Sequence, residues 1–247
     1  NKVELFIMDE TLNTLPTSRP LPNGKKDIKQ LVKKGVPDIN KNFGKKVLEM
    51  GEYFKEIIEE YEEFQDHVYL YHPDLQGPMD ICEVLWGSDL FLDINDEPQL
   101  VHDMLEIITQ TYIKFMKAWN EIVPFTGNYT VHWGLFHKGN IMLRDDSAMN
   151  FSPEMFNQFI KPYDQRLLNE FDGGAIHFCG KGDHYIESLS EMDNIHAVNM
   201  SQPNYNDMET IYQNTVDKGI KILGLNRETA EKAVKEGRDL KGNVHCG

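Results

Sequence analysis

The second half of the chain alternates short apolar runs with amphipathic stretches, and this pattern limits the fold more than any other feature of the sequence. The apolar runs predict strands and the amphipathic stretches predict helices. In chain order these are a strand at 173–180, a helix at 184–191, a strand at 195–200, a helix at 207–218, a strand at 220–225, a helix at 228–236 and a last strand at 243–246. Short connections in such an alternation are typical of a parallel sheet with helices on its faces. The sequence therefore predicts an α/β fold.

The first half of the chain is mainly helical by the same criterion. Apolar residues recur at helical spacing over 45–64, 80–87 and 96–119. The other segments predict a strand at 3–8, a proline-rich loop at 13–26, a strand at 67–75, a strand toward the end of 129–144 and a helix capped by Ser152. No repeat or low-complexity tract divides the chain, which favours a single domain over residues 1–247.

The stretch GGAIHFCG at 173–180 is the first candidate for chemistry. His177 and Cys179 are two positions apart, so on a strand their side chains point to the same side, and Gly180 lets the backbone turn away. Cys246 also follows a predicted strand, and strand ends in a barrel converge on one mouth. Three such ligands leave a fourth position for water or substrate, as in catalytic zinc sites. The alternative is that both cysteines are ordinary buried residues.

Acidic and polar residues at other strand ends form a second candidate group. Asp145, Asp146 and Ser147 follow a predicted strand, and two adjacent carboxylates are costly to bury together. We expect at least one aspartate to face a pocket as a catalytic group or to pair with the neighbouring arginine. His72 and Glu83 lie near another predicted strand end, so these two and Ser147 are candidate substrate-binding residues. The alternative for the two aspartates is a solvated turn.

The charge and cysteine content narrow the classes of partner. The chain has 25 basic and 40 acidic residues, a net charge of −15, which argues against nucleic acid or an anionic membrane as a partner. Three cysteines do not suggest a disulfide framework and favour a cytoplasmic setting. No apolar run approaches the roughly 20 residues that span a bilayer. Because the first residue is Asn1, we expect that an N-terminal segment is missing.

Three blocks of sequence, in this order, resemble the uroporphyrinogen decarboxylase superfamily. They are QGPMDICEVLWGSDLFLDINDEPQLVHDMLEIIT at 76–109, LRDDSAMNFSPEMFNQFIKPY at 143–163 and GGAIHFCGKGDHYIESLSEM at 173–192. The similarity extends over most of residues 35–247. The fold that this resemblance implies is a (β/α)8 TIM-type barrel, here without its first one or two strand–helix units.

The resemblance also implies a function. One branch of the superfamily contains zinc methyltransferases of the methylcobamide:coenzyme M type, which exchange a methyl group with a corrinoid (cobalamin) protein. His177, Cys179 and Cys246 match its zinc ligands. We therefore expect zinc, a corrinoid partner protein and a small methyl donor or thiol acceptor. A metal-free decarboxylase is the first alternative, although its polyanionic substrate needs a basic pocket and the chain has only five arginines. A non-catalytic homologue is the second.

Overall fold

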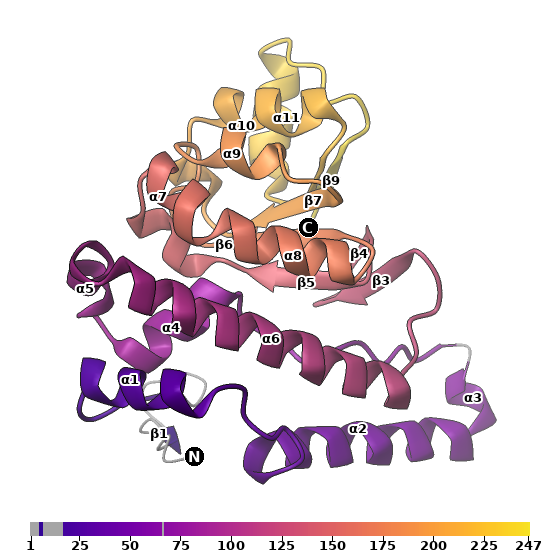
Figure 1. The fold of residues 1–247 in the computed structure, drawn as a ribbon. Coiled ribbons are helices and arrows are strands. Elements are labelled where there is room, and N and C mark those ends of the chain that lie inside the picture. Colours follow the sequence, from indigo (N-terminus) through magenta and orange to yellow (C-terminus); the bar gives the residue numbers. More distant parts are fainter. Residues whose placement is uncertain (1–4, 7–16, 66) are drawn as a thin grey trace.

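A five-stranded parallel sheet forms the centre of the C-terminal half of the molecule (Figure 1). The computed structural model describes residues 5–6, 17–65 and 67–247. The strands of the sheet lie side by side in chain order, and they are β5 (Ile141–Arg144), β6 (Gly174–Phe178), β7 (Ile195–Met200), β8 (Lys221–Leu225) and β9 (Val244–Cys246). All four neighbouring pairs are parallel. The α/β fold expected from the alternating pattern is confirmed.

Helices connect these strands and cover one face of the sheet. In the C-terminal half they are α7 (Pro153–Phe159), α8 (Lys161–Glu170), α9 (Ile186–Ser190), α10 (Met208–Asn214) and α11 (Arg227–Lys235). The first half contributes α1 (Lys25–Lys34), α2 (Asn42–Glu60), α3 (Glu62–Gln65), α4 (Pro78–Trp86), α5 (Leu90–Asp96) and α6 (Pro98–Ile122). The long helix α6 packs against α1, α2 and α4 on one side and against α8 on the other (Figure 1). None of the helices in the described part of the chain is long and apolar enough to cross a bilayer.

The two faces of the sheet carry different residues because side chains alternate along each strand. One face belongs to the main core under the helices, and it includes Leu143, Ile176 and Val198. The opposite face, which we call the inner face, has a small separate cluster of Met142, Ala175, Ala197 and Leu223. A hairpin of β3 (Tyr129–His132) and β4 (Leu135–Lys138) lies against this inner face and contacts β6 and β7.

Most of the expected helices are confirmed, with shifted ends. The helix expected at 45–64 is α2 and α3, and those expected at 80–87 and 96–119 are α4 and α6. Ser152 caps α7 as expected, since its Oγ accepts the Met155 N–H at 3.3 Å. The helix breaks at Ile160, and α8 begins at Lys161, followed by Pro162, which has no N–H to donate.

Several local expectations were wrong or lie outside the described residues. The strand expected at 67–75 is absent, since residues 68–77 form neither helix nor strand. The segment does not form a regular ladder with β5. The Met142 N–H donates to the ring of His72 and not to a backbone carbonyl, and Pro73 has no N–H. Within the segment 13–26, expected to be a loop, Thr17–Ser18 form β2, and α1 begins at Lys25. The rest of that segment up to residue 16 lies outside the described residues. So does the strand expected at 3–8, apart from β1 (Leu5–Phe6), which pairs with β2.

The order of the strands and the two edges of the sheet bear on the expected barrel. Five strands follow one another in sequence, and among the described residues β5 and β9 remain its two edges. The segment before α4 runs along the free edge of β5, where the Gly77 N–H donates to the Arg144 carbonyl at 2.7 Å. A closed (β/α)8 barrel therefore stays a prediction.

Candidate metal centre

The carboxyl edge of the sheet aligns four residues in one row. Arg144 on β5 is in register with His177 on β6, His177 with Asn199 on β7, and Asn199 with Leu223 on β8. In-register residues of neighbouring parallel strands point to the same side, here the inner face. The row therefore brings a cation, an imidazole and an amide together above the small side chains of the inner face.

The ring of His177 is held in one orientation by Asn199. Its Nδ1 lies 2.5 Å from the Asn199 Oδ1, while the Nδ2 of the same amide donates to the Leu223 carbonyl at 2.7 Å. Because the amide presents an oxygen to the ring, Nδ1 is the protonated nitrogen and Nε2 carries the lone pair. Burial lowers the pKa of His177, which favours this neutral form. A histidine fixed in this way is typical of metal ligands.

The thiol of Cys179 lies beside this lone pair. Its Sγ is 3.4 Å from the His177 Nε2 and 3.4 Å from the Ser201 Oγ. Burial raises the pKa of the Cys179 thiol in the absence of a metal. The chain turns away at Gly180, whose φ of 73° suits glycine, and a Cβ there would lie 2.7 Å from the Met149 sulfur. The turn expected at Gly180 is present.

Asp146 completes a group of three donor atoms. Arg144 donates from Nη2 to the Asp146 Oδ2 at 2.8 Å, so the expected pairing of one aspartate with the neighbouring arginine is found here. The other oxygen, Oδ1, is buried without a hydrogen-bond donor among the described residues and lies 3.5 Å from the His177 Nε2. One ligand atom from each of Asp146, His177 and Cys179 lies within 4.8 Å of the other two. Oxygen, nitrogen and sulfur donors at this spacing fit a zinc ion.

A polar layer from α4 supports the turn that carries Asp146. The carboxylate of Asp80 accepts the N–H groups of Asp146 and Ser147 at 2.9 and 2.7 Å, and Glu83 accepts the Ser147 hydroxyl at 2.5 Å. Burial raises the pKa of Asp80 to about 6, although these donors oppose the shift. Ser147 and Glu83 are thus hydrogen-bonded to each other next to the three-donor group.

Trp133 packs against two residues of the row, Arg144 and His177. The hairpin turns at Trp133, whose φ of 49° is an unusual conformation for a bulky residue. Its indole lies 5.3 Å from the Arg144 guanidinium and 5.0 Å, edge to face, from the His177 ring. A strained aromatic residue beside a candidate site is consistent with a functional role.

Asp145 points to the opposite side of the sheet from Asp146. It is 1% exposed, and its carboxyl faces that of Asp164 on α8, which is also 1% exposed. No other described side chain or backbone group donates to their four oxygens. Burial, followed by the neighbouring carboxyl groups, raises the pKa of Asp145 well above its usual value, and burial raises that of Asp164 to about 8. A proton shared by the pair satisfies both groups at neutral pH.

The other two expected site residues lie away from the three-donor group. Cys246 ends β9, three strands beyond β6, and is not part of the group. Neighbouring strands are about 4.8 Å apart, so β6 and β9 are separated by roughly 14 Å along the sheet. His72 is buried near the middle of β5, where its Nδ1 donates to the Pro73 carbonyl at 2.7 Å and its Nε2 accepts the Met142 N–H.

Comparisons with known proteins found similar folds among solved structures but no match among family models or curated proteins. Among solved structures, a methyltransferase from Methanosarcina mazei has a similar fold, with a TM-score of 0.60 and 15% sequence identity. The match covers 90% of this chain and 58% of the other, so the chain spans a little over half the length of that protein. At this identity the likeness shows a shared fold alone.

The sequence interpretation missed three residues that shape the site. Asn199 lies within an apolar strand, and a polar residue at that position was the available signal for a buried hydrogen bond. Trp133 and Gly134 form the turn between β3 and β4. This dipeptide indicates a hairpin turn only when the flanking strands are recognised. Asp164 carried no signal, since an aspartate in a helix is usually exposed.

Proposed function

We propose that the chain is a zinc-dependent methyltransferase that moves a methyl group to or from a corrinoid carried by a separate protein. His177, Cys179 and Asp146 would hold the metal, so Asp146 takes the place expected for Cys246. The observation that carries this proposal is the cluster of three donor atoms within 4.8 Å at the carboxyl edge of the sheet. Active sites of parallel α/β folds lie at this edge.

The donor atoms are suited to a metal for independent reasons. The His177 Nε2 has its lone pair directed to the group because Asn199 engages Nδ1. The Asp146 Oδ1 is buried with no donor, a state that costs free energy unless a cation satisfies it. Arg144 balances the charge of the other oxygen and fixes the carboxylate in place.

The chain's own residues would bind and orient the reactants. Zinc bound by a thiolate, an imidazole and a carboxylate supplies Lewis acidity, which lowers the pKa of a thiol or polarises a methylated oxygen or nitrogen. Three protein donors leave one position of a tetrahedral zinc for that atom. Trp133 would limit the access of water from the hairpin side, and the small side chains of Ala175 and Ala197 leave room on the inner face.

The proposal includes a corrinoid protein as partner and a complete (β/α)8 barrel as the fold. A corrinoid protein would dock over the carboxyl edge of the sheet, because the methyl group must reach the metal centre there. The five strands in chain order are consistent with the successive strands of a (β/α)8 barrel. The resemblance of the sequence to the zinc methyltransferase branch supports both points.

Metal analysis is the direct test of the site. The purified protein is stripped with a chelator, dialysed against zinc and measured by elemental analysis. We expect one zinc per chain, and cobalt(II) in its place should give an absorption band of thiolate-to-metal charge transfer. Failure to retain any metal, or a cobalt spectrum without the thiolate band, would contradict the site.

Methyl transfer tests the activity separately from metal binding. Methylcobalamin is incubated with the zinc-loaded protein and a panel of thiols, and the visible spectrum of the corrinoid is followed. We expect demethylation of the corrinoid with the zinc-loaded protein and none with the stripped protein. Decarboxylation of a porphyrinogen by the stripped protein would favour the metal-free decarboxylase instead.

A further inference from the structure

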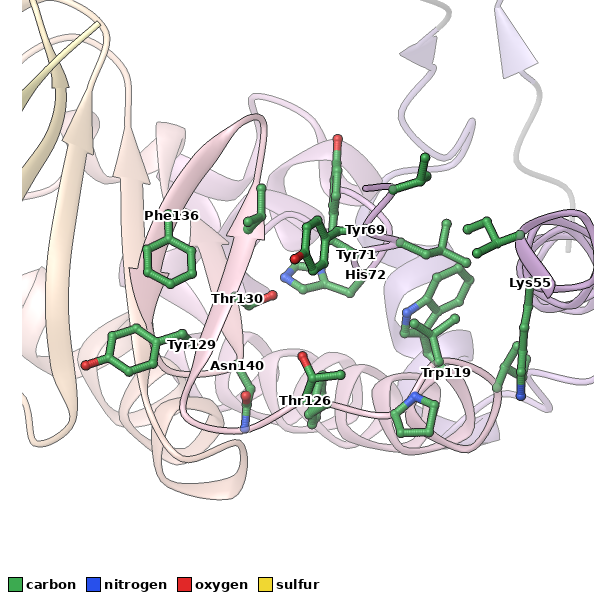
Figure 2. Close-up of a pocket in the computed structure, with 18 of the residues that line it drawn as sticks. Lys55, Tyr69, Tyr71, His72, Trp119, Thr126, Tyr129, Thr130, Phe136 and Asn140 are labelled. Carbon is green, nitrogen blue, oxygen red and sulfur yellow. The ribbon is translucent and has the colours of Figure 1, made fainter. Parts of the chain in front are cut away.

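A cavity lies away from the metal centre, toward the amino end of β5. It has a volume of about 560 Å³, within the range of small-molecule sites. Figure 2 shows its walls: the segment around Tyr69 and Tyr71, the ends of α2 and α6 with Lys55 and Trp119, and the hairpin side with Asn140. Because Asn140 directly precedes β5 and Asp146 follows it, the cavity and the metal centre belong to different ends of this strand.

The lining of this cavity is rich in aromatic rings that the fold leaves exposed. Tyr69 is 70% exposed, Phe136 64% and Tyr129 53%. The rings of Tyr129 and Phe136 stack at 5.3 Å with an interplanar angle of 7°. Aromatic side chains gathered around a concave surface are unusual for a free protein surface and are typical of a binding site.

One polar group in the lining is unsatisfied. The side-chain Oδ1 of Asn140 is buried and has no hydrogen-bond partner among the described residues, and the whole residue is only 4% exposed. Its backbone N–H is already used, since it donates to the Gly173 carbonyl at 2.8 Å. A buried acceptor of this kind costs about 1–3 kcal/mol unless a donor reaches it.

From these observations we propose that the cavity binds a planar aromatic molecule that carries an N–H or O–H donor. The molecule stacks among the exposed rings, and its donor bonds to the Asn140 Oδ1. The site is separate from the proposed methyl-transfer chemistry, and its occupation needs no metal. It thus adds a second small-molecule site on the same domain.

Calorimetric titration with two matched probes tests the proposal. Indole is planar and carries an N–H, whereas benzofuran has the same shape with an oxygen in its place. We expect saturable binding of one indole per chain and about tenfold weaker binding of benzofuran. The Asn140→Leu variant should bind the two probes equally. Indole binding that does not saturate, or equal affinity of the native protein for both probes, would overturn the proposal.

Exposed residues provide variants that keep the fold intact. Tyr69→Ser and Phe136→Ser each remove one exposed ring from the cavity wall, and each should weaken indole binding several-fold with an unchanged melting temperature. Tyr53→Ser is the matched control, because Tyr53 is 56% exposed on α2 and does not line the cavity. Indole affinity should be the same in this control and in protein stripped of zinc. Equal weakening in all three variants would show that indole binds elsewhere.

Discussion

Asp145 and Asp146 are neighbours in the chain, yet they lie on opposite sides of the sheet and in opposite chemical surroundings. Asp146 is bound by Arg144 on the inner side and turns its free oxygen to His177. Asp145 is enclosed on the helix side, where its carboxyl faces a second buried carboxyl, that of Asp164. The first environment leaves a carboxyl oxygen beside two other donor atoms, and the second favours a protonated carboxyl group.

The difference shows that the side of the strand decides what an acidic residue can do. Both aspartates directly follow the same strand, β5, and both belong to the same sequence motif. On the inner side, the lone pair of His177 in β6 and the thiol of Cys179, just after β6, also lie close to Asp146. Variants on the two sides distinguish these environments. A general loss of stability would follow from a change on either side, whereas a loss of metal would follow only from a change on the inner side.

The largest effect is expected for the thiol. The Cys179→Ser variant replaces a thiolate, the softest donor of the group, by a hydroxyl that stays protonated at neutral pH. We expect the zinc affinity to fall by about a thousandfold, close to 4 kcal/mol. Competition with a zinc-binding dye measures the affinity, and circular dichroism checks that the fold is kept. Zinc retained at full stoichiometry and affinity would contradict the assignment of Cys179.

The two aspartates are expected to differ next. Asp146→Asn replaces a charged donor by a neutral amide, so we expect zinc affinity to fall by about a hundredfold, or roughly 3 kcal/mol. Asp145→Asn should leave the affinity within about threefold, because that residue faces Asp164 instead of the metal group. Equal losses in the two variants would show that the sides of the strand are not chemically separate.

Cys246→Ser decides between the two sets of ligands. Its thiol lies outside the three-donor group, so the variant should bind zinc as the native protein does. A loss as large as that of Cys179→Ser, together with normal binding by Asp146→Asn, would restore the ligand set His177, Cys179 and Cys246. The same dye competition is used for all four variants.

A smaller effect is expected for the residue behind the histidine. Asn199→Ala removes the acceptor that fixes the His177 ring, while the ligand atoms themselves remain. Groups of this kind typically contribute 10–100-fold to metal affinity, and we expect about tenfold here. Asn199→Asp keeps an acceptor at the same place and should restore tight binding. No change in the alanine variant would show that the hydrogen bond does not orient the ring.

The sequence was sufficient for features that depend on local pattern. The order of β6, β7, β8 and β9 followed from the alternation of apolar runs and helices, and α2, α4 and α6 followed from helical spacing. The proximity of His177 and Cys179 also followed, because two residues of one strand point to the same side.

Features that depend on contacts between distant segments were not accessible in this way. Whether Asp145 or Asp146 faced the inner side depended on where β5 ends, and that boundary could not be placed within the segment 129–144. Asp164 meets Asp145 only because α8 packs beneath β5. The segment 68–77 has the composition of a strand, but its ladder is broken by the ring of His72 and by Pro73.

The carboxyl pair is expected to affect stability, with little effect on metal binding. Asp164 ionises near 3.8 when unperturbed and near 8 in the folded protein, so between these values the folded state holds a proton that the unfolded state has lost. Stability is therefore complete at the acidic end and is lost as the pH rises toward 8. One proton changes the free energy of unfolding by at most about 1.4 kcal/mol per pH unit. Urea unfolding of metal-free protein at pH 5, 6, 7 and 8 measures this slope.

Asp164→Asn should reduce that slope, because the amide keeps the shape of the pair and donates to Asp145 without titrating. We expect the variant to gain stability relative to the native protein as the pH rises, by about 1 kcal/mol or more at pH 8. Asp96→Asn, an exposed change on α5, should leave the slope as it is. Parallel curves for the native protein and Asp164→Asn would mean that the pair is ionised in the folded state. The helix side of β5 would then hold two unneutralised charges, and the contrast with the metal side would be lost.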